Sequence, residues 1–127
     1  MIKKLIYAVA ILSITACTES LEDKAEREAK EYTEKVCPTP YVNNCRTDSA
    51  VFDKNSKTYT YYVTLQGKAD NAIAINANKK KLHEMQKQGI DNNPGLKKYK
   101  EAHFSFRFVY RSASENGKVL LDDTFKY

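Results

Sequence analysis

The sequence predicts an α+β fold, a two-layer domain with an antiparallel sheet of about four strands and helices on one face. Three observations lead to this prediction. The chain has 127 residues, a length that suits one domain. Apolar residues recur at three- and four-residue steps in two segments, and they alternate with polar residues in other segments. These segments follow one another in the order helix, two strands, helix, two strands, which is typical of hairpins and helices that are segregated along the chain.

The first sixteen residues differ in composition from the rest of the chain. Lys3 and Lys4 form a short positive segment, and residues 5–16 are apolar apart from Ser13 and Thr15. About 20 residues are needed to span a hydrocarbon core of about 30 Å, so this stretch is too short for a transmembrane helix. Its charge and length are typical of a secretory signal peptide.

The leader ends in Ile14-Thr15-Ala16-Cys17, which resembles the lipobox of bacterial lipoproteins. The resemblance implies cleavage before Cys17, a diacylglycerol on its thiol and acyl chains such as palmitate on the new amino terminus. Several acyl chains anchor a domain firmly, because each buried CH₂ contributes about 0.8 kcal/mol. The expected parts are therefore a cleaved leader, a lipidated cysteine with a short tether, and a single domain, at residues 1–16, 17–20 and 21–127. An ordinary signal peptide or an uncleaved anchor is the alternative.

A lipid anchor on Cys17 would place the protein in the bacterial cell envelope. We expect the outer membrane, and the sequence leaves open whether the domain faces the periplasm or the cell exterior. Loss of two lysines with the leader lowers the charge balance from 21 basic against 16 acidic residues to 19 against 16, a net charge of +3. This modest charge does not indicate nucleic-acid binding.

Cys37 and Cys45 are the two cysteines that remain after Cys17. An even pair in an oxidising compartment predicts a structural disulfide, which would stabilise the domain by about 2–3 kcal/mol. A redox or metal pair is the alternative. The spacing is not CxxC, however, and neither His83 nor His103 lies nearby in the sequence. We therefore expect no metal site and no cofactor.

Residues 21–36 are predicted to form the first helix. Its apolar side chains recur at helical spacing at Leu21, Ala25, Ala29, Tyr32 and Val36. Ser20 is a candidate N-cap, and Cys37-Pro38 ends the segment. We expect the helix to pack on its own domain. A partner-binding or membrane-lying helix is the alternative, although the acidic residues on its polar face disfavour anionic lipid.

Two strands are expected next, at residues 46–53 and 58–66, with a hairpin loop between them. The second strand alternates well, with Tyr59, Tyr61, Val63 and Leu65 on one face and Thr58, Thr60, Tyr62, Thr64 and Gln66 on the other. Residues 70–88 are predicted to be a second helical region, with Gly89 just beyond its end. Pro94 is placed to start a short helix, and it stays open whether residues 70–102 form one helix or two.

The C-terminal part predicts a second pair of strands. One face of the first carries Phe104, Phe106, Phe108 and Tyr110, and the other carries Ser105, Arg107, Val109 and Arg111. Asn116-Gly117 is a strong hairpin signal, and residues 119–127 alternate again.

A looser resemblance covers most of residues 21–127. Its features are a leading helix that ends in proline, an Arg-x-Asp-Ser motif, a Tyr-x-Tyr strand, and a closing aromatic strand followed by Gly-Lys. In this chain they are Pro38 or Pro40, Arg46-Thr47-Asp48-Ser49, Tyr59-Thr60-Tyr61, Phe104 to Tyr110 and Gly117-Lys118. The pattern resembles small bacterial envelope domains without an assigned activity, so it implies a fold and no chemistry.

The sequence does not indicate an enzyme. GxSxG, HExxH and P-loop spacings are all missing from it. His83 and His103 are expected to be solvated or half-buried. Asp122-Asp123 lies on a predicted strand, where adjacent side chains point to opposite faces, so the two carboxylates cannot share a proton or a metal.

Two charged groups have an ordinary interpretation and a functional one. Arg46 and Asp48 share a strand face, where they either form a salt bridge or hold a ligand carboxylate or sugar. Lysines gather in the second helical region, at Lys79, Lys80, Lys81, Lys87, Lys97, Lys98 and Lys100. They form either a solvated helix face or a contact with anionic lipid heads, lipopolysaccharide phosphates or an acidic partner.

The candidate binding surface is the sheet face that the helices leave open. It carries a mixed aromatic and basic set, which comprises Tyr62, Thr60, Thr64, Arg107 and Arg111. We predict a non-enzymatic binding or assembly module, membrane-anchored through Cys17, that docks another envelope protein through this face or a sheet edge. The alternatives are capture of a small ligand or glycan between sheet and helix, and inhibition of an extracellular enzyme by occlusion.

Overall fold

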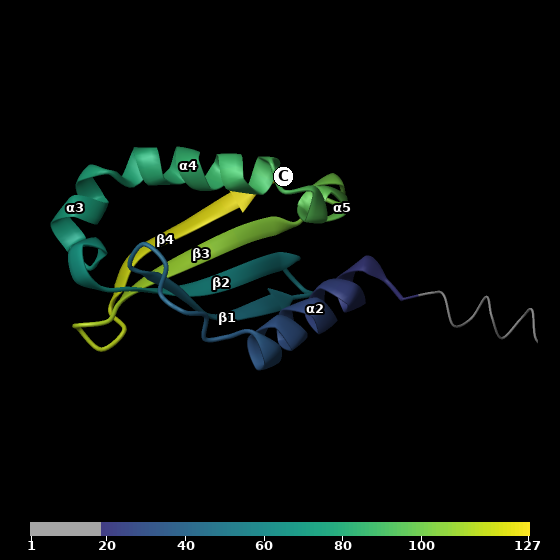
Figure 1. Ribbon diagram of the computed structural model, residues 1–127. Helices are drawn as coiled ribbons and strands as arrows, with labels where there is room; N and C mark the ends of the chain where they lie inside the picture. The colour runs from purple at the N-terminus through teal and green to yellow at the C-terminus, as the bar shows by residue number, and fades with distance from the viewer. Residues whose placement is uncertain (1–18) are drawn as a thin grey trace, which may run out of the picture.

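The computed structural model describes residues 19–127 (Figure 1). The predicted leader and the lipidation site Cys17 lie outside these residues. The helices are α2 (Leu21–Lys35), α3 (Ala72–Ala77), α4 (Lys79–Asp91) and α5 (Lys97–Glu101), with 3₁₀ turns η1 (Gly67–Ala69) and η2 (Pro94–Leu96). The strands are β1 (Cys45–Asp53), β2 (Thr58–Leu65), β3 (Ser105–Ser112) and β4 (Val119–Lys126). These elements confirm the predicted α+β fold with four strands.

The four strands form one sheet in the order β1-β2-β3-β4. The pairs β1–β2 and β3–β4 are antiparallel hairpins, as predicted, but β2 and β3 run parallel. The sheet is therefore mixed and not antiparallel throughout. The reason is the long connection between Leu65 and Ser105, which carries three helices and returns the chain to the starting edge of the sheet. A crossover of this kind joins parallel strands.

Helices α2, α4 and α5 lie on one face of the sheet, because their buried side chains join the same core. Figure 1 shows α2 along the β1 side of the sheet and α4 along the β4 side. The buried helix residues Ala25, Ala29, Ile90 and Tyr99 pack in one cluster with aromatic side chains of the sheet and of the segment before β3, such as Phe52, Tyr59, Phe104, Phe106 and Phe108. The alternation of each strand thus separates a helix-covered face from an uncovered one.

The first helix forms as its sequence predicts. The Ser20 hydroxyl accepts a hydrogen bond from the Asp23 N–H at 3.0 Å, which satisfies one of the free donors of the first turn. Its small buried residues allow the helix to lie close to β1. Deeper in the helix, the Thr33 hydroxyl accepts a hydrogen bond from the Ala50 N–H at 2.9 Å, so α2 is also tied to β1 by a polar contact.

Residues 70–102, for which the sequence left one helix or two open, form three helices. Asn78, with φ −107° and ψ 12°, separates α3 from α4. Gly89 lies inside α4 and not beyond its end, because the helix continues to Asp91. The short helix expected at Pro94 is present as η2 followed by α5, and Tyr99 on α5 is buried.

The structure does not support the predicted disulfide, because Cys37 and Cys45 are both free thiols. Asn43 and Asn44 have positive φ angles of 52° and 64°, and they form a tight turn that places Cys45 opposite Val42. Beyond this turn the Thr39 N–H donates to the Thr47 carbonyl, so the segment before Thr39, which carries Cys37, continues past Thr47 and away from Cys45. Burial raises the pKa of both thiols and keeps them protonated.

None of the helices in residues 19–127 is long and apolar enough to cross a membrane. In the same range, no three histidine, cysteine, aspartate or glutamate side chains gather closely enough to hold a metal ion.

Candidate functional site

The five residues predicted for the binding surface lie together on the uncovered face of the sheet. Thr60 is paired with Arg107 and Thr64 with Arg111 across the parallel β2–β3 ladder, and Tyr62 lies between them. Thr60 and Thr64 are only 8% and 9% exposed. Since no helix of the described chain covers this face, the long side chains of neighbouring arginine and tyrosine residues shield them. The solvent-exposed part of this set is therefore made by Tyr62, Arg107 and Arg111.

Asp48 organises one end of this face. It lies at an irregularity of β1, between Thr47 and Ser49, that shifts the register of the hairpin. Arg46 Nε donates to one carboxylate oxygen at 2.9 Å, and Arg111 Nη2 donates to the other at 3.0 Å. The Thr64 hydroxyl also donates to Asp48. The predicted Arg46–Asp48 salt bridge is thus part of a larger cluster, in which one carboxylate holds two guanidinium groups.

The ionisation of Asp48 follows from these contacts. Burial by itself raises the pKa of the carboxyl, because the charged form loses water. Hydrogen bonds from Thr64, Arg111 and Arg46 outweigh burial and hold the pKa of Asp48 below its ordinary value. Asp48 is therefore a fixed negative charge at neutral pH.

Each arginine of the cluster also lies over a tyrosine ring. The guanidinium of Arg111 is 4.9 Å from the ring centre of Tyr62, and that of Arg46 is 4.9 Å from the ring centre of Tyr41. Both arginines and Tyr41 border a hollow of about 470 Å³ beside Thr64 and Gly117. A guanidinium has five N–H donors, so both arginines keep donors that are free of Asp48. The cluster can therefore accept a carboxylate or the hydroxyls of a sugar.

Arg107 is held in the same manner at the other end of the face. Its Nε and Nη2 donate to the two oxygens of Asp122 at 2.8 and 2.6 Å. Asp123 points to the opposite face, as predicted, where its carboxylate lies 2.8 Å from His83 Nδ1. His83 also stacks on Phe125 with ring centres 4.4 Å apart, so it links α4 to β4 and has a structural role.

A second hollow, which the sequence did not locate, lies on the helix-covered face. It has a volume of about 430 Å³ and is bordered by four tyrosines together with Glu28, Asn93, Gly95 and Leu96. The tyrosines are Tyr32 from α2, Tyr59 and Tyr61 from β2, and Tyr99 from α5. We call this hollow the tyrosine groove.

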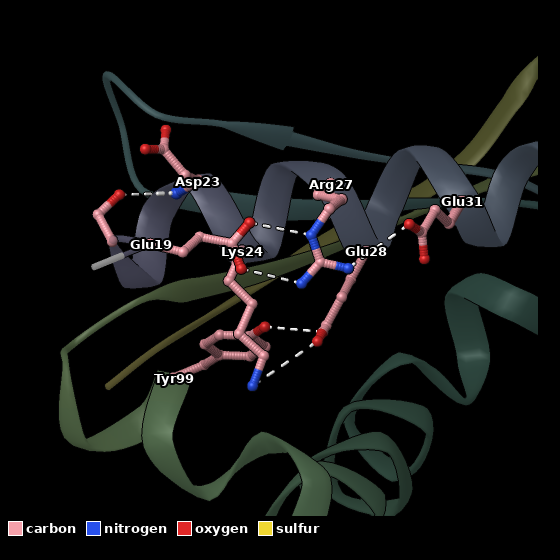
Figure 2. A network of polar contacts seen from close by, with 8 residues as sticks. Glu19, Asp23, Lys24, Arg27, Glu28, Glu31 and Tyr99 are labelled. Atoms are coloured by element: carbon pink, nitrogen blue, oxygen red, sulfur yellow. Dashed lines mark hydrogen bonds and ion pairs between the residues drawn. The ribbon is translucent and has the colours of Figure 1, made fainter. Parts of the chain in front are cut away.

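Glu28 and Tyr99 face one another across the groove, from α2 and α5 (Figure 2). The Tyr99 hydroxyl donates to Glu28 Oε2 at 2.8 Å. Burial raises the pKa of Tyr59, Tyr61 and Tyr99, and the Glu28 carboxylate adds to the effect, so the hydroxyls stay neutral donors. The sequence contained one signal of this groove, namely tyrosines with polar hydroxyls on the helix-facing side of β2.

Comparison with solved structures shows where this architecture recurs. A protein of Pseudomonas aeruginosa classed as secreted has a TM-score of 0.68 at 12% identity, over 85% of this chain and 95% of that one. The pilotin of the type II secretion system of Vibrio vulnificus has a TM-score of 0.61 at 15% identity, over 82% of this chain and 86% of that one. The pilotin AspS of Vibrio cholerae, from the same type of system, gives 0.57 at 14% identity, over 83% and 87%. At these identities the likeness concerns the fold alone.

The sequence comparisons give one match. No curated protein matches the chain. A family model described as a domain of unknown function, DUF8479, matches residues 20–121, which include the first helix, the helical crossover and nearly all of the sheet. The chain therefore belongs to the DUF8479 family.

Proposed function

We propose that this protein is a lipid-anchored envelope module that binds another envelope protein through the uncovered face of its sheet and has no enzymatic activity. The observation that carries the proposal is the set of arginines on this face. Arg46 and Arg111 are held by Asp48, Arg107 is held by Asp122, and two of the three lie over tyrosine rings.

This arrangement suits protein recognition for two reasons. Arginine and tyrosine are enriched among the residues that dominate binding energy at protein interfaces. Side chains that are already fixed before binding lose less conformational entropy when a partner arrives. Arg107 and Arg111 are fixed by carboxylates but keep 40% and 33% of their side chains exposed, so they remain accessible to a partner.

Lipid attachment at Cys17 is the second part of the proposal, and the lipobox-like sequence at residues 14–17 supports it. The first helix starts at Leu21, so only a short tether would separate the domain from the lipid. The fold comparisons agree with an envelope role in outline. Two similar folds are pilotins of type II secretion systems, and a third belongs to a protein classed as secreted.

The test is a pull-down of the tagged full chain from crosslinked native membranes, read by mass spectrometry. We expect one stoichiometric envelope protein with the wild type, and its loss in the double variant Tyr62→Ala/Arg107→Ala. This variant should still fold, because Asp122 is 42% exposed and can be solvated without its arginine. Lys118→Ala, on the exposed β3–β4 turn, is the matched control and should keep the partner.

Two outcomes would contradict the proposal in separate parts. Retention of the partner by the folded double variant would exclude the uncovered face as the docking surface. Cys17→Ala tests the anchor, because it should leave the protein outside the membrane fraction and without incorporated palmitate. Unchanged membrane association of that variant would exclude the lipid anchor. The docking surface is tested separately by the double variant.

The tyrosine groove favours a second candidate function, which is capture of a glycan or small polar ligand between sheet and helix. Aromatic rings can stack on sugar faces, and Glu28 and the tyrosine hydroxyls can bond to sugar hydroxyls. A thermal-shift screen of residues 18–127 with a panel of envelope glycans tests it. A shift that disappears in Tyr61→Ala would favour ligand binding, and no shift across the panel would count against it.

A further inference from the structure

A surface on α3 and the start of α4 combines exposed apolar side chains with lysines. Ile73 is 83% exposed and Met85 is 59% exposed, and Ile73 is the most exposed large apolar residue in the part of the chain described here. The six residues of α3 include none that is buried. We call this region the α3–α4 surface, and its charged members are Lys68, Lys79, Lys80 and Lys81.

The surface is hollowed where α3 meets α4. The hollow has a volume of about 310 Å³ and an apolar lining that includes Ile75, Leu82 and Met85, with alanines Ala69 and Ala74. Lys68 and Lys81 lie at its border. Apolar side chains of a bound segment could therefore enter the hollow while lysines lie beside them.

Within the part of the chain that the structure describes, the lysines of this surface have no acidic partner. Among residues 19–127, none of Lys68, Lys79, Lys80 and Lys81 has a carboxylate oxygen within 4.0 Å, whereas Lys54 and Lys87 do. The nearest acidic residue in sequence to Lys68 is Asp70, and its carboxylate is bonded to the Ser114 N–H and hydroxyl at 2.9 and 2.7 Å. The positive charge is thus left free to bind an external group.

The lysines do not stabilise the helix that carries them. Lys79, Lys80 and Lys81 form the first turn of α4, where the helix dipole favours negative charge and each cation is unfavourable by about 0.3–1 kcal/mol. The exposed Ile73 likewise contributes no burial to the fold. A role in folding therefore explains neither the charges nor the exposed side chain of Ile73.

We propose that the α3–α4 surface binds an acidic amphipathic segment of a protein partner. Apolar side chains of that segment would fill the hollow between Ile75, Leu82 and Met85, and its carboxylates would lie on the lysines. Charge complementarity selects this occupant. The proposal goes beyond docking on the uncovered sheet face, since it assigns a second surface and the chemistry of what binds there.

An anionic lipid surface is the other occupant that such a helix could have, and the position of the anchor argues against it. Figure 1 shows α3 at one end of the molecule and the beginning of α2 at the other. The strands between these ends have eight or nine residues, which is about 25–30 Å. If Cys17 is lipidated, as the proposed function states, the short tether keeps the start of α2 at the membrane and directs the α3–α4 surface away from it.

The experiment measures binding of a fluorescent peptide of about two heptads, with leucine on one helical face and glutamate elsewhere, to the full lipidated protein anchored in phosphatidylcholine nanodiscs. We expect saturable binding that weakens about tenfold in Lys79→Glu/Lys80→Glu/Lys81→Glu, and similarly in Met85→Ser. Both variants should fold, because acidic residues suit the first turn of α4 and Met85 is exposed.

Matched controls make the result decisive. Lys97→Glu/Lys98→Glu changes exposed lysines on α5, outside the surface, and should bind the peptide like the wild type. A peptide with lysine in place of glutamate should not bind. Equal binding of the acidic and basic peptides, or full binding by the triple α4 variant, would overturn the proposal.

A competition arm separates the two kinds of occupant. Vesicles of phosphatidylglycerol should displace the peptide no better than vesicles of phosphatidylcholine at equal lipid. Selective displacement by phosphatidylglycerol would assign the surface to lipid and overturn the protein partner. Tyr62→Ala/Arg107→Ala should bind the peptide normally, so failure of this inference can be distinguished from failure of docking on the sheet face.

Discussion

Asp48 is the single residue on which the uncovered face depends, because three side chains donate to its carboxylate. Its side chain is only 16% exposed, so solvent replaces these bonds poorly. We expect Asp48→Asn to lower the free energy of unfolding by about 2 kcal/mol at pH 7, as for hydrogen bonds to a charged group. Urea unfolding measures this loss. Asp122→Asn, which changes an exposed pair, should cost less than about 1 kcal/mol, and an equal cost for both variants would contradict the argument.

The pH dependence of the free energy of unfolding is a second test of the role of Asp48. The pKa of Asp48 is lower in the folded protein than in the unfolded chain, where it is about 3.9. Its contribution is therefore present above the unfolded pKa and is lost as the pH falls through the folded pKa. The difference in unfolding free energy between wild type and Asp48→Asn should shrink below about pH 4. A difference that stays constant down to pH 2 would show that the carboxylate is not the stabilising group.

For the two cysteines we predict that a change of redox conditions has no effect on stability. Both thiols are free and protonated, so reductant should leave the free energy of unfolding of residues 18–127 unchanged. A thiol titration of the unfolded chain should count two reactive groups. A loss of about 2–3 kcal/mol on adding reductant would instead demonstrate a disulfide between Cys37 and Cys45.

At the scale of elements, alternation and helical spacing located all four strands and the first helix within about two residues, because each buries one face. Two features of the fold depended on connecting segments, which these patterns do not describe. The tight turn at Asn43 and Asn44 separates the cysteines, and its signal is the two adjacent asparagines that tolerate positive φ. The parallel pairing of β2 with β3 depends on the helical crossover between them, whose length of more than a dozen residues was the available signal.

The contact between α2 and α5 is the element-scale interaction that shapes the tyrosine groove (Figure 2). Glu28 accepts from the Tyr99 hydroxyl, while Lys24 lies 3.8 Å from the same carboxylate. A double-mutant cycle with Glu28→Gln and Tyr99→Phe should give a coupling energy of about 1 kcal/mol in urea unfolding. Glu31→Gln with Tyr99→Phe is the control and should be additive. No coupling in the first cycle would mean that the contact does not hold the two helices together.

For the whole molecule, the sequence predicted which residues share the uncovered face of the sheet but not how their side chains are organised. Tyr62, Arg107 and Arg111 were named from alternation alone, which fixes the face on which a side chain lies. The pairing of Arg107 with Asp122 and of Arg111 with Asp48 depends on strand order and register, and a one-residue shift would separate each pair. The tyrosine groove needs α2 and α5 to approach the same sheet, which is a property of the complete fold.

Local stability should differ across the molecule in a way that bears on the proposed α3–α4 surface. The core cluster joins all four strands with α2, α4 and α5, whereas α3 contributes no buried side chain. Segments with little burial open locally at low free-energy cost, while the central strands exchange only through global unfolding. Amides of Ile75 to Ala77 should therefore exchange at least about a hundredfold faster than those of Phe106 to Val109 in hydrogen-exchange mass spectrometry. If an acidic partner covers this surface, adding the glutamate-leucine peptide should slow exchange in α3 and leave β3 unchanged. Equal protection of α3 and β3 without peptide would contradict the assignment of α3 as a weakly packed element that is available for binding.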